Sequence, residues 1–280
     1  MSRFLIYIFI IMQIIGCQRP DGIKKEDFVR LRMIPSRQWE NLSSKRIFFG
    51  HQSVGVNIIE GIKELSGLLI DGLKLNIKET TNLEDFQGPV FAHKRIGRNL
   101  DPYSKCDEFR SLMESGLGQV VDIAFFKFCY VDITSSTDID KLISYYESTM
   151  SYLKEKYPNV KFIHFTVPLT VNYLENGWKS RIKRILRGEK GEVDNNIARN
   201  IFNKELIKRM GSMENIFDLA KYEAMFMNGK MNIFHKRGIG YYFLISSYTD
   251  DGGHLNILGR RYIARKFLEF LVSLDSSQGN

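Results

Sequence analysis

Three side chains that could together cleave an ester lie far apart in the chain. Ser53 belongs to the stretch Gly-His-Gln-Ser-Val-Gly at residues 50–55, and Asp251 precedes His254 by three residues. A carboxylate in that position can accept the Nδ1–H of the imidazole, which leaves Nε2 free to take a proton from a serine hydroxyl. These residues therefore predict nucleophilic chemistry if the fold brings them together.

The stretch at residues 50–55 has three interpretations. Gly50 and Gly55 have the spacing of a phosphate-binding loop, but Val56 and Asn57 follow where such a loop needs a lysine and a hydroxyl side chain. A serine between a strand and a helix, with a glycine that permits a tight turn, is well placed as a nucleophile. Serine is also a frequent helix N-cap, and the stretch taken alone favours the cap.

Alternating strand and helix patterns must position these residues. Short runs rich in Ile, Phe and Val predict five strands, at residues 46–50, 73–78, 121–129, 160–167 and 215–219. Helical patterns are expected near residues 54–65, 105–115, 138–156, 193–210 and 255–274. This alternation predicts an α/β fold, a three-layer α/β/α sandwich with a mainly parallel five-stranded sheet. Active groups in such folds gather at the carboxyl ends of the strands.

A serine after the first strand, together with Asp-x-x-His before the last helix, resembles the SGNH/GDSL hydrolase family. The resemblance covers residues 45–274 and implies a flavodoxin-like fold. It also implies that Ser53 is the nucleophile, His254 the general base and Asp251 the acid that orients the histidine. The variant Gly-His-Gln-Ser-Val-Gly resembles the first block of a divergent bacterial branch, and its His51 and Gln52 replace an aspartate outside the triad.

The resemblance implies an oxyanion hole that this chain builds differently. Gly97, in the segment His-Lys-Arg-Ile-Gly-Arg-Asn, is expected to supply the backbone N–H of the second block. The asparagine of the third block is missing, because the chain reads Phe-Lys-Phe-Cys-Tyr-Val-Asp at residues 126–132. Asn99, Lys127 or Tyr130 could replace that donor, or the hole could be weaker than usual. Losing one such donor costs about 10²–10³ in rate.

Other polar residues have a structural and a functional interpretation. His51, His93, His254 and Asp251 could meet around a metal, but no close His-x-His or His-Glu-x-x-His spacing supports this, and we expect neither a metal nor a cofactor. His51 and Gln52 are instead expected to line the pocket or to bond the nucleophile turn. Asp218, after the last strand, is a candidate pocket residue or a helix cap.

The amino terminus indicates export. Arg3, a largely apolar run over residues 4–15 and Gly16-Cys17 form a secretory signal pattern that is too short to span a bilayer. The pattern resembles a bacterial lipobox, which implies a signal peptide at residues 1–16 and a lipoprotein anchored to a membrane of the cell envelope by acyl chains such as palmitate on Cys17. An ordinary signal peptide cut elsewhere and an uncleaved anchor are the alternatives.

The remaining chain reads as one domain. Residues 17–45 are expected to form a tether and lead-in segment, and residues 46–275 the catalytic domain, with a basic insertion at 172–192 and an aromatic one at 221–248. The basic insertion could be an amphipathic helix on a membrane or glycan, or a solvated surface helix. Cys106 and Cys129 could pair or remain buried thiols.

Charge and location narrow the function. The net charge is +8, but the basic residues are spread out and show no zinc-finger spacing or basic region with heptads, so nucleic acid is not expected as a partner. We expect a secreted, lipid-anchored serine esterase that removes O-acetyl groups from carbohydrate through an acyl-enzyme on Ser53. A lipid esterase and a non-catalytic glycan-binding lipoprotein are the alternatives.

Overall fold

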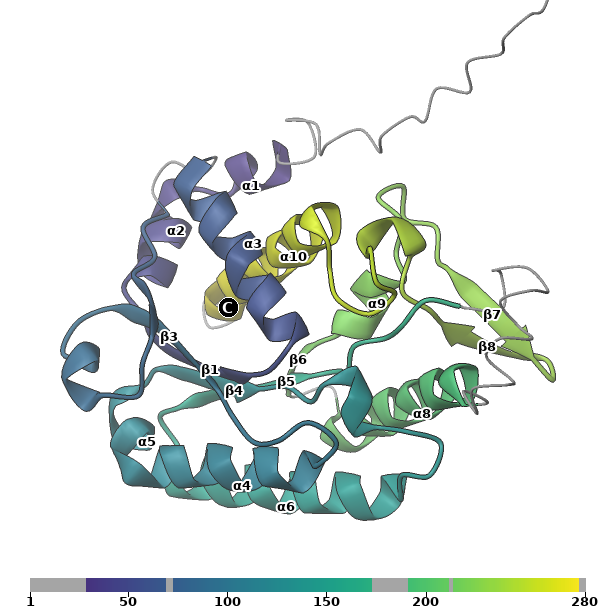
Figure 1. The fold of residues 1–280 in the computed structure, drawn as a ribbon. Helices are drawn as coiled ribbons and strands as arrows, with labels where there is room; N and C mark the ends of the chain where they lie inside the picture. Colours follow the sequence, from purple (N-terminus) through teal and green to yellow (C-terminus); the bar gives the residue numbers. More distant parts are fainter. Residues whose placement is uncertain (1–28, 69–72, 173–190, 212–213, 277–280) are drawn as a thin grey trace, which may run out of the picture.

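A six-stranded parallel sheet forms the centre of the computed structural model, which describes residues 29–68, 73–172, 191–211 and 214–276 (Figure 1). The strand order is β2-β3-β1-β4-β5-β6, and every neighbouring pair is parallel. The strands are β1 (Arg46–His51), β2 (Ile77–Glu79), β3 (Val90–Arg95), β4 (Ile123–Phe126), β5 (Lys161–Phe165) and β6 (Asn215–Phe217).

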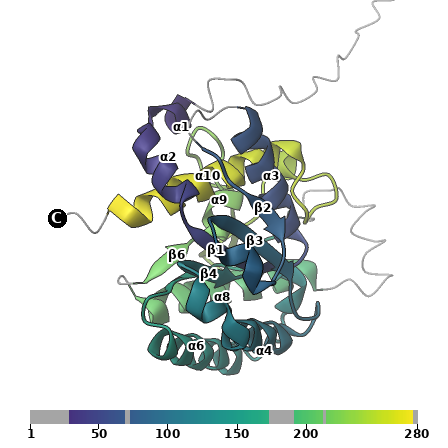
Figure 2. The same cartoon turned by 90° about the vertical axis from the view of Figure 1, so that its left-hand side faces the viewer.

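Helices cover both faces of this sheet (Figures 1 and 2). One face carries α1 (Val29–Met33), α2 (Ser36–Ser43), α3 (Val54–Leu68), α9 (Leu219–Glu223) and α10 (Ile257–Ser276). The other face carries α4 (Pro102–Leu112), α5 (Gly118–Val120), α6 (Ile139–Lys156) and α8 (Glu192–Met210). A separate cluster of buried apolar side chains fills each interface. The three-layer α/β sandwich predicted from the alternating pattern is confirmed.

The sheet has one more strand than the sequence pattern predicts. β3 lies between β2 and β1, where Val90 to Ala92 are buried and Lys94 and Arg95 are exposed. The pattern missed it because its apolar run is only three residues long and its second half, His93-Lys94-Arg95, resembles a surface loop. The prediction of five strands was therefore wrong, because it lacked β3.

The two expected insertions differ in outcome. The aromatic stretch at 221–248 holds an antiparallel hairpin of β7 (Ile233–Lys236) and β8 (Ile239–Tyr242). Arg237 and Gly238 join its strands with φ values of 53° and 79°, as a two-residue hairpin turn requires. The basic stretch at 172–192 lies almost entirely outside the described residues, as do residues 1–28, which include Cys17.

The cysteines that the structure describes are unpaired. Cys106 and Cys129 are both buried free thiols, so the alternative of a disulfide between them is not realised. Burial raises the pKa of Cys106, chiefly because a thiolate would lose its hydration there. A thiol that stays protonated is a weak nucleophile, so Cys106 is a packing residue.

The contact between α3 and α10 joins the two ends of the domain. A Cβ atom on Gly61 of α3 would lie 2.4 Å from the carbonyl oxygen of Arg260 and 2.8 Å from Cβ of Ala264. Arg260 also forms ion pairs with Glu60 and Glu64 of α3. Since α3 begins immediately after Ser53 and α10 three residues after His254, this contact fixes Ser53 and His254 relative to one another.

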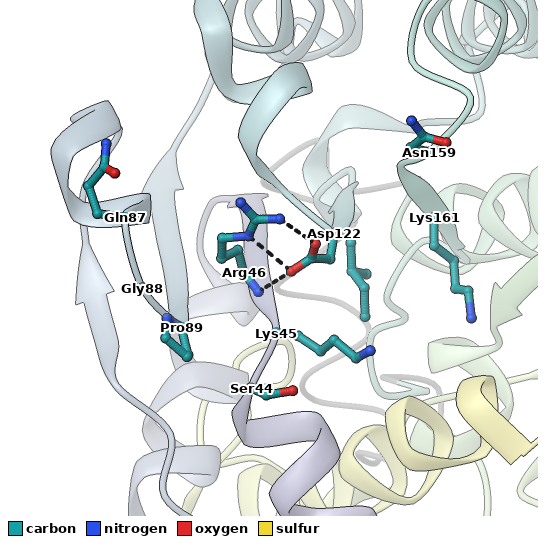
Figure 3. Close-up of a pocket in the computed structure, with 10 residues that line it drawn as sticks. Ser44, Lys45, Arg46, Gln87, Gly88, Pro89, Asp122, Asn159 and Lys161 are labelled. Atoms are coloured by element: carbon teal, nitrogen blue, oxygen red, sulfur yellow. Dashed lines mark hydrogen bonds and ion pairs between the residues drawn. The ribbon is translucent and has the colours of Figure 1, made fainter.

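A hollow of about 590 Å³ lies at the edge of the sheet where the strands begin, opposite the edge that carries Ser53 (Figure 3). Figure 3 shows Arg46 and Asp122 facing each other, and Asp122 accepts from the backbone N–H as well as the guanidinium of Arg46. Lys161 donates to the carbonyl oxygen of Leu274 at the end of α10. These charged groups join the starts of β1, β4 and β5 and do not face the edge that carries Ser53.

Replacing Gly61 by alanine is expected to destabilise the domain. Alanine normally favours a helix over glycine, but here the added methyl forces α3 and α10 apart, which overpacks the interface by about 1–3 kcal/mol. Urea denaturation followed by circular dichroism measures the change. Gly88→Ala is the matched control, because nothing lies within 4 Å of a Cβ at that position. Equal stability of the two variants would contradict the role given to this contact.

Candidate active site

Ser53 lies in a strained turn at the carboxyl end of β1. Its φ is +49°, a left-handed conformation that is uncommon for residues other than glycine. Val54 begins α3 directly after it, so the turn projects the hydroxyl from the edge of the sheet. Gly55 is required by the same turn, because a Cβ there would lie 2.4 Å from Cβ of His51.

Asp251 and His254 form a compact loop before α10. One carboxylate oxygen of Asp251 accepts from the backbone N–H groups of Gly253 at 2.9 Å and His254 at 2.8 Å, and the other lies 2.6 Å from Nδ1 of His254. Partial burial by itself raises the pKa of Asp251, but these hydrogen bonds outweigh burial and lower the pKa to about 2. The carboxylate is therefore ionised at neutral pH and holds the ring by Nδ1.

The two loops meet although they are 201 residues apart. Oγ of Ser53 lies 2.5 Å from Nε2 of His254. Asn57 of α3 strengthens the arrangement, since its side-chain oxygen accepts from the N–H of Leu255 at 3.2 Å. The ring of Tyr130 stands edge-on to His254, with centroids 5.7 Å apart. The structure thus brings together the serine, histidine and aspartate singled out in the sequence, in the order of a hydrogen-bonded relay.

His51 lies beneath this site rather than in it. The side chain is 1% exposed, packs on the ring of Phe49, and has Nε2 at 3.1 Å from Nδ1 of His93. Burial, together with the smaller effects of the nearby His93, Lys127 and Arg95, lowers the pKa of His51 to about 2, so the ring is neutral. Within the described residues, no group of three or more His, Cys, Asp or Glu side chains could hold a metal ion.

Gln52 joins the nucleophile turn to the loop after β3. Its side-chain amide donates to the carbonyl oxygens of Ile96 at 3.2 Å and Gly97 at 2.9 Å. The backbone reinforces this connection, because Ile96 donates its N–H to the carbonyl of His51. His51 and Gln52 therefore hold β3 and its following loop against the turn that carries Ser53.

The structure corrects the role expected of Gly97. Its backbone N–H donates to the carboxylate of Glu108 at 2.7 Å and so already has an acceptor. Its φ is +59°, and a Cβ would lie 2.4 Å from Cγ of Lys105, so glycine is required here by backbone geometry and close packing. In this structure Gly97 shapes the loop and is not an oxyanion donor.

Two further candidates have internal partners. Lys127 is 1% exposed and donates to the carbonyl of Phe128, so it cannot reach a substrate at the sheet edge. Burial lowers the pKa of Lys127. Asp218 is the N-cap of α9: its side chain accepts from the N–H of Lys221 and from the hydroxyl of Thr166. Asp218 was a candidate pocket residue or helix cap, and its contacts in the structure are those of a cap.

Sequence reasoning missed the buried ion pair of Lys105 and Asp132. Both side chains are 0% exposed, and Asp132 also accepts from the N–H groups of Cys129 and Leu100. The pair joins α4, the end of β4 and the loop that contains Asn99. The only sequence signal was Asp132 at the end of an apolar strand, where a carboxylate can accept backbone N–H groups.

A second buried carboxylate lies behind the site. Glu223 of α9 is 0% exposed and accepts from the N–H of Leu169 at 2.6 Å through one oxygen, while the other has no hydrogen-bond partner among the described residues. Burial raises the pKa of Glu223 to about 8, against the smaller opposing effects of that hydrogen bond and of Lys127 and Arg199. The side chain is therefore mostly protonated at neutral pH.

Glu223 predicts a pH dependence of stability. Between about pH 4.5 and 8 the folded state retains a proton that the unfolded state releases, so stability falls as the pH rises through this window. One proton corresponds to a slope of at most about 1.4 kcal/mol per pH unit. Glu223→Gln keeps an acceptor for Leu169 and should remove this component. Urea unfolding of both proteins at pH 5, 6, 7 and 8 measures the slopes, and parallel slopes would contradict the assignment.

Comparisons with known proteins find similarity to solved structures alone, at low sequence identity. No family model and no curated protein matches the chain. Solved structures with a similar arrangement include a protein described as an acylhydrolase from Bacteroides fragilis, 12% identical, with a TM-score of 0.47 and coverage of 87% of this chain and 97% of that one. A protein described as a platelet activating factor from Streptococcus pneumonia is 13% identical, with a TM-score of 0.45 and coverage of 88% and 95%.

A further similar structure is a protein described as a GDSL-like lipase from Parabacteroides merdae, 11% identical, with a TM-score of 0.40 and coverage of 82% of this chain and 96% of that one. In the described residues no helix is both long and apolar enough to cross a membrane.

The parallel sheet carries Ser53 after its first strand and Asp251-x-x-His254 before the last helix. The chain therefore has a three-layer α/β fold, with the serine and the Asp-x-x-His pair at the places in it that the sequence resemblance implies.

Proposed function

We propose that this protein is a serine ester hydrolase with Ser53 as nucleophile. The observation that carries the proposal is the relay in which Ser53 Oγ lies 2.5 Å from Nε2 of His254 and Nδ1 of His254 lies 2.6 Å from Asp251. A hydroxyl, an imidazole and an ionised carboxylate in this order form a general-base system for acyl transfer. The strained turn at Ser53 and the low pKa of Asp251 both support it.

The proposed reaction has two steps, acylation of Ser53 and hydrolysis of the acyl-enzyme. Ser53 Oγ attacks the ester carbonyl carbon while its proton moves to Nε2 of His254, and the carbonyl electron pair moves onto oxygen. The C–O bond to the alcohol then breaks, His254 returns the proton to the leaving alcohol, and the acyl group remains on Ser53. A water molecule attacks this acyl-enzyme with His254 again as base, which releases the acid and restores Ser53.

The proposed substrate is an O-acetylated carbohydrate. The side chains of His254 and Asp251 are 43% and 58% exposed, so the relay lies in an open part of the surface. Such a site suits a small acyl group presented by a bulky, polar alcohol more than a long acyl chain, which needs a deep apolar pocket. Acetate release from acetylated glycans, compared with release of longer acids from lipid esters, distinguishes this substrate from the lipid alternative.

Substitution of the relay tests the proposed reaction. Ser53→Ala and His254→Ala are expected to lower kcat for p-nitrophenyl acetate by about 10³–10⁶, and Asp251→Asn by about 10⁴, because each removes a step of proton transfer. Lys94→Ala, an exposed change on β3, is the matched control with an unchanged rate. Equal rates in wild type and all three relay variants would reject hydrolysis by this site and favour a glycan-binding protein. Binding of glycan by Ser53→Ala would then identify that alternative.

We further propose that the protein is exported and anchored to a membrane of the cell envelope through a lipid on Cys17. The signal pattern at residues 1–16 supports this proposal. Cys17→Ser should abolish incorporation of an alkyne-labelled palmitate and release the protein from the membrane fraction. Labelling that persists in Cys17→Ser, or a wild type that takes up no label, would contradict it.

A further inference from the structure

A cavity of about 610 Å³ lies beside β6, the strand at one edge of the sheet. Residues of α8 and of β8 line it, together with Asp218 and Ala220 where α9 begins, and Figure 1 shows the hairpin of β7 and β8 close to α8. Among the described residues that line it, none belongs to the turn of Ser53 or to the loop before α10. The cavity is therefore separate from the proposed catalytic relay, and its volume is typical of small-molecule sites.

Exposed apolar side chains give this cavity an apolar lining. Ile201 and Ile207 of α8 are 43% and 39% exposed, and Ile239 of β8 is 56% exposed. Tyr241 lies on the same face of β8 as Ile239, because alternate residues of a strand point the same way. Single exposed isoleucines are ordinary on a protein surface, but three that line one cavity beside a tyrosine suit the apolar body of a ligand.

Two asparagines of α8 hold the walls of the cavity in place. Asn203 donates to the carbonyl oxygen of Val167 at 2.9 Å and accepts from its N–H at 2.6 Å. Asn200 is bonded in the same two ways to the backbone of Tyr242, at 3.0 and 2.8 Å. α8 is thus fixed both to the loop after β5 and to β8. A cavity with walls held in this way is formed before a ligand arrives, so binding costs little reorganisation.

Asp218 brings an unused carboxylate oxygen to the cavity. Both hydrogen bonds that make it a helix cap, from the hydroxyl of Thr166 at 3.0 Å and the N–H of Lys221 at 3.2 Å, go to Oδ1. Oδ2 has no hydrogen-bond partner among the described residues. Burial raises the pKa of Asp218, and the opposing effects of these two hydrogen bonds and of the Lys221 charge are smaller. The carboxylate charge is therefore poorly solvated and only partly satisfied.

The other charged groups that line the cavity do not compensate this carboxylate. Glu205 forms an ion pair with Lys208 at 3.5 Å, and Lys204 is exposed. In the described part of the chain, Lys221 is the one charged side chain that lowers the pKa of Asp218, and its charge is the smallest of the effects on that pKa. A positive group that entered the cavity would therefore meet a carboxylate in need of a donor.

We propose that this cavity binds an organic ammonium ion, which donates an N–H to Oδ2 of Asp218 and lays its apolar body against Ile201, Ile207 and Ile239. A carboxylate oxygen only accepts, so its partner must be a donor, and a cation restores the stabilisation that the carboxylate loses on burial. A neutral apolar molecule would bury Oδ2 without a partner. A tyrosine ring such as that of Tyr241 adds attraction for a cation. The inference does not depend on the hydrolase function.

Benzylammonium is the probe, and benzyl alcohol is its uncharged match, because both carry a hydrogen-bond donor on the same apolar group. In an NMR titration of the whole protein we expect benzylammonium to bind at about millimolar concentration or below, and about tenfold more tightly than benzyl alcohol. The amide shifts should change most at Ala220 and Gly240, which line the cavity. No binding, equal affinity for the two probes, or shift changes centred elsewhere would overturn the proposal.

Asp218→Asn is the decisive variant, because it removes the charge and keeps the helix cap. Asparagine caps a helix as well as aspartate does, and with its oxygen toward Lys221 its amide nitrogen replaces Oδ2. We expect the affinity for benzylammonium to fall by about tenfold or more, and that for benzyl alcohol to change by less than about threefold. An unchanged affinity for benzylammonium would refute the role given to Asp218.

Glu205→Gln is the matched control, since Glu205 is a second carboxylate that lines the same cavity but pairs with Lys208. It should bind benzylammonium within about twofold of wild type. A loss as large as that in Asp218→Asn would show a general effect of negative charge and would contradict the contact with Oδ2. Thermal unfolding of each variant shows whether the domain stays folded, and the comparison of the two probes on the wild type needs no variant.

Ile239→Ser tests the place of the apolar body. Because it removes apolar contact and no charge, it should weaken both probes by the same factor, about threefold or more. Unchanged affinities would contradict a ligand that lies against β8. No ester is present in these titrations, so their failure leaves the proposal for Ser53 intact, and inactivity of the relay leaves this cavity to be judged by binding alone.

Discussion

The close contact of α3 with α10 at Gly61 is the constraint on which the site depends. Ser53 and His254 come from opposite ends of the domain, and no strand pairing holds their loops together. Only a glycine lets the backbone of α10 approach α3 closely enough, with the Arg260 carbonyl in the place of a side chain. A hydrogen bond of 2.5 Å between the two loops tolerates displacements of only a few tenths of an ångström, so helix packing sets the distance between Ser53 and His254.

Backbone strain is concentrated at the same edge of the sheet. Of the non-glycine residues with positive φ among those described, Ser53 and Leu100 lie on the two loops beside the site, and the third, Arg237, is in a hairpin turn. Each conformation costs of order 1–3 kcal/mol and persists only where surrounding contacts enforce it. The parallel sheet enforces the first and Asp132 the second. This pairing of strain with restraint is what a pre-organised site requires.

The sequence predicted the residues whose chemistry is local and missed those whose role is set by contacts across the chain. The Asp-x-x-His spacing lets a carboxylate reach an imidazole within a short stretch of chain, and apolar runs identify most buried strands. By contrast, the interpretation of Gly97 failed because a glycine fits equally well as a donor and as a turn residue. Glu108, which occupies its N–H, is separated from it by the start of a helix. The partnership of Lys105 with Asp132 likewise spans 27 residues and has no spacing signature.

Buried charged side chains hold the irregular loops beside the site. Arg199 is 1% exposed, and its guanidinium holds the carbonyl oxygens of Tyr130 at 2.7 Å and Ile133 at 3.2 Å, so it fixes the loop after β4. Lys105 and Asp132 fix the loop after β3. Ion pairs of this kind contribute little net stability, because desolvation offsets their attraction. They do satisfy irregular backbone that has no sheet partner, and apolar side chains could not. The carboxyl edge of the sheet is irregular where it carries Ser53, and these buried charges hold the neighbouring loops in place.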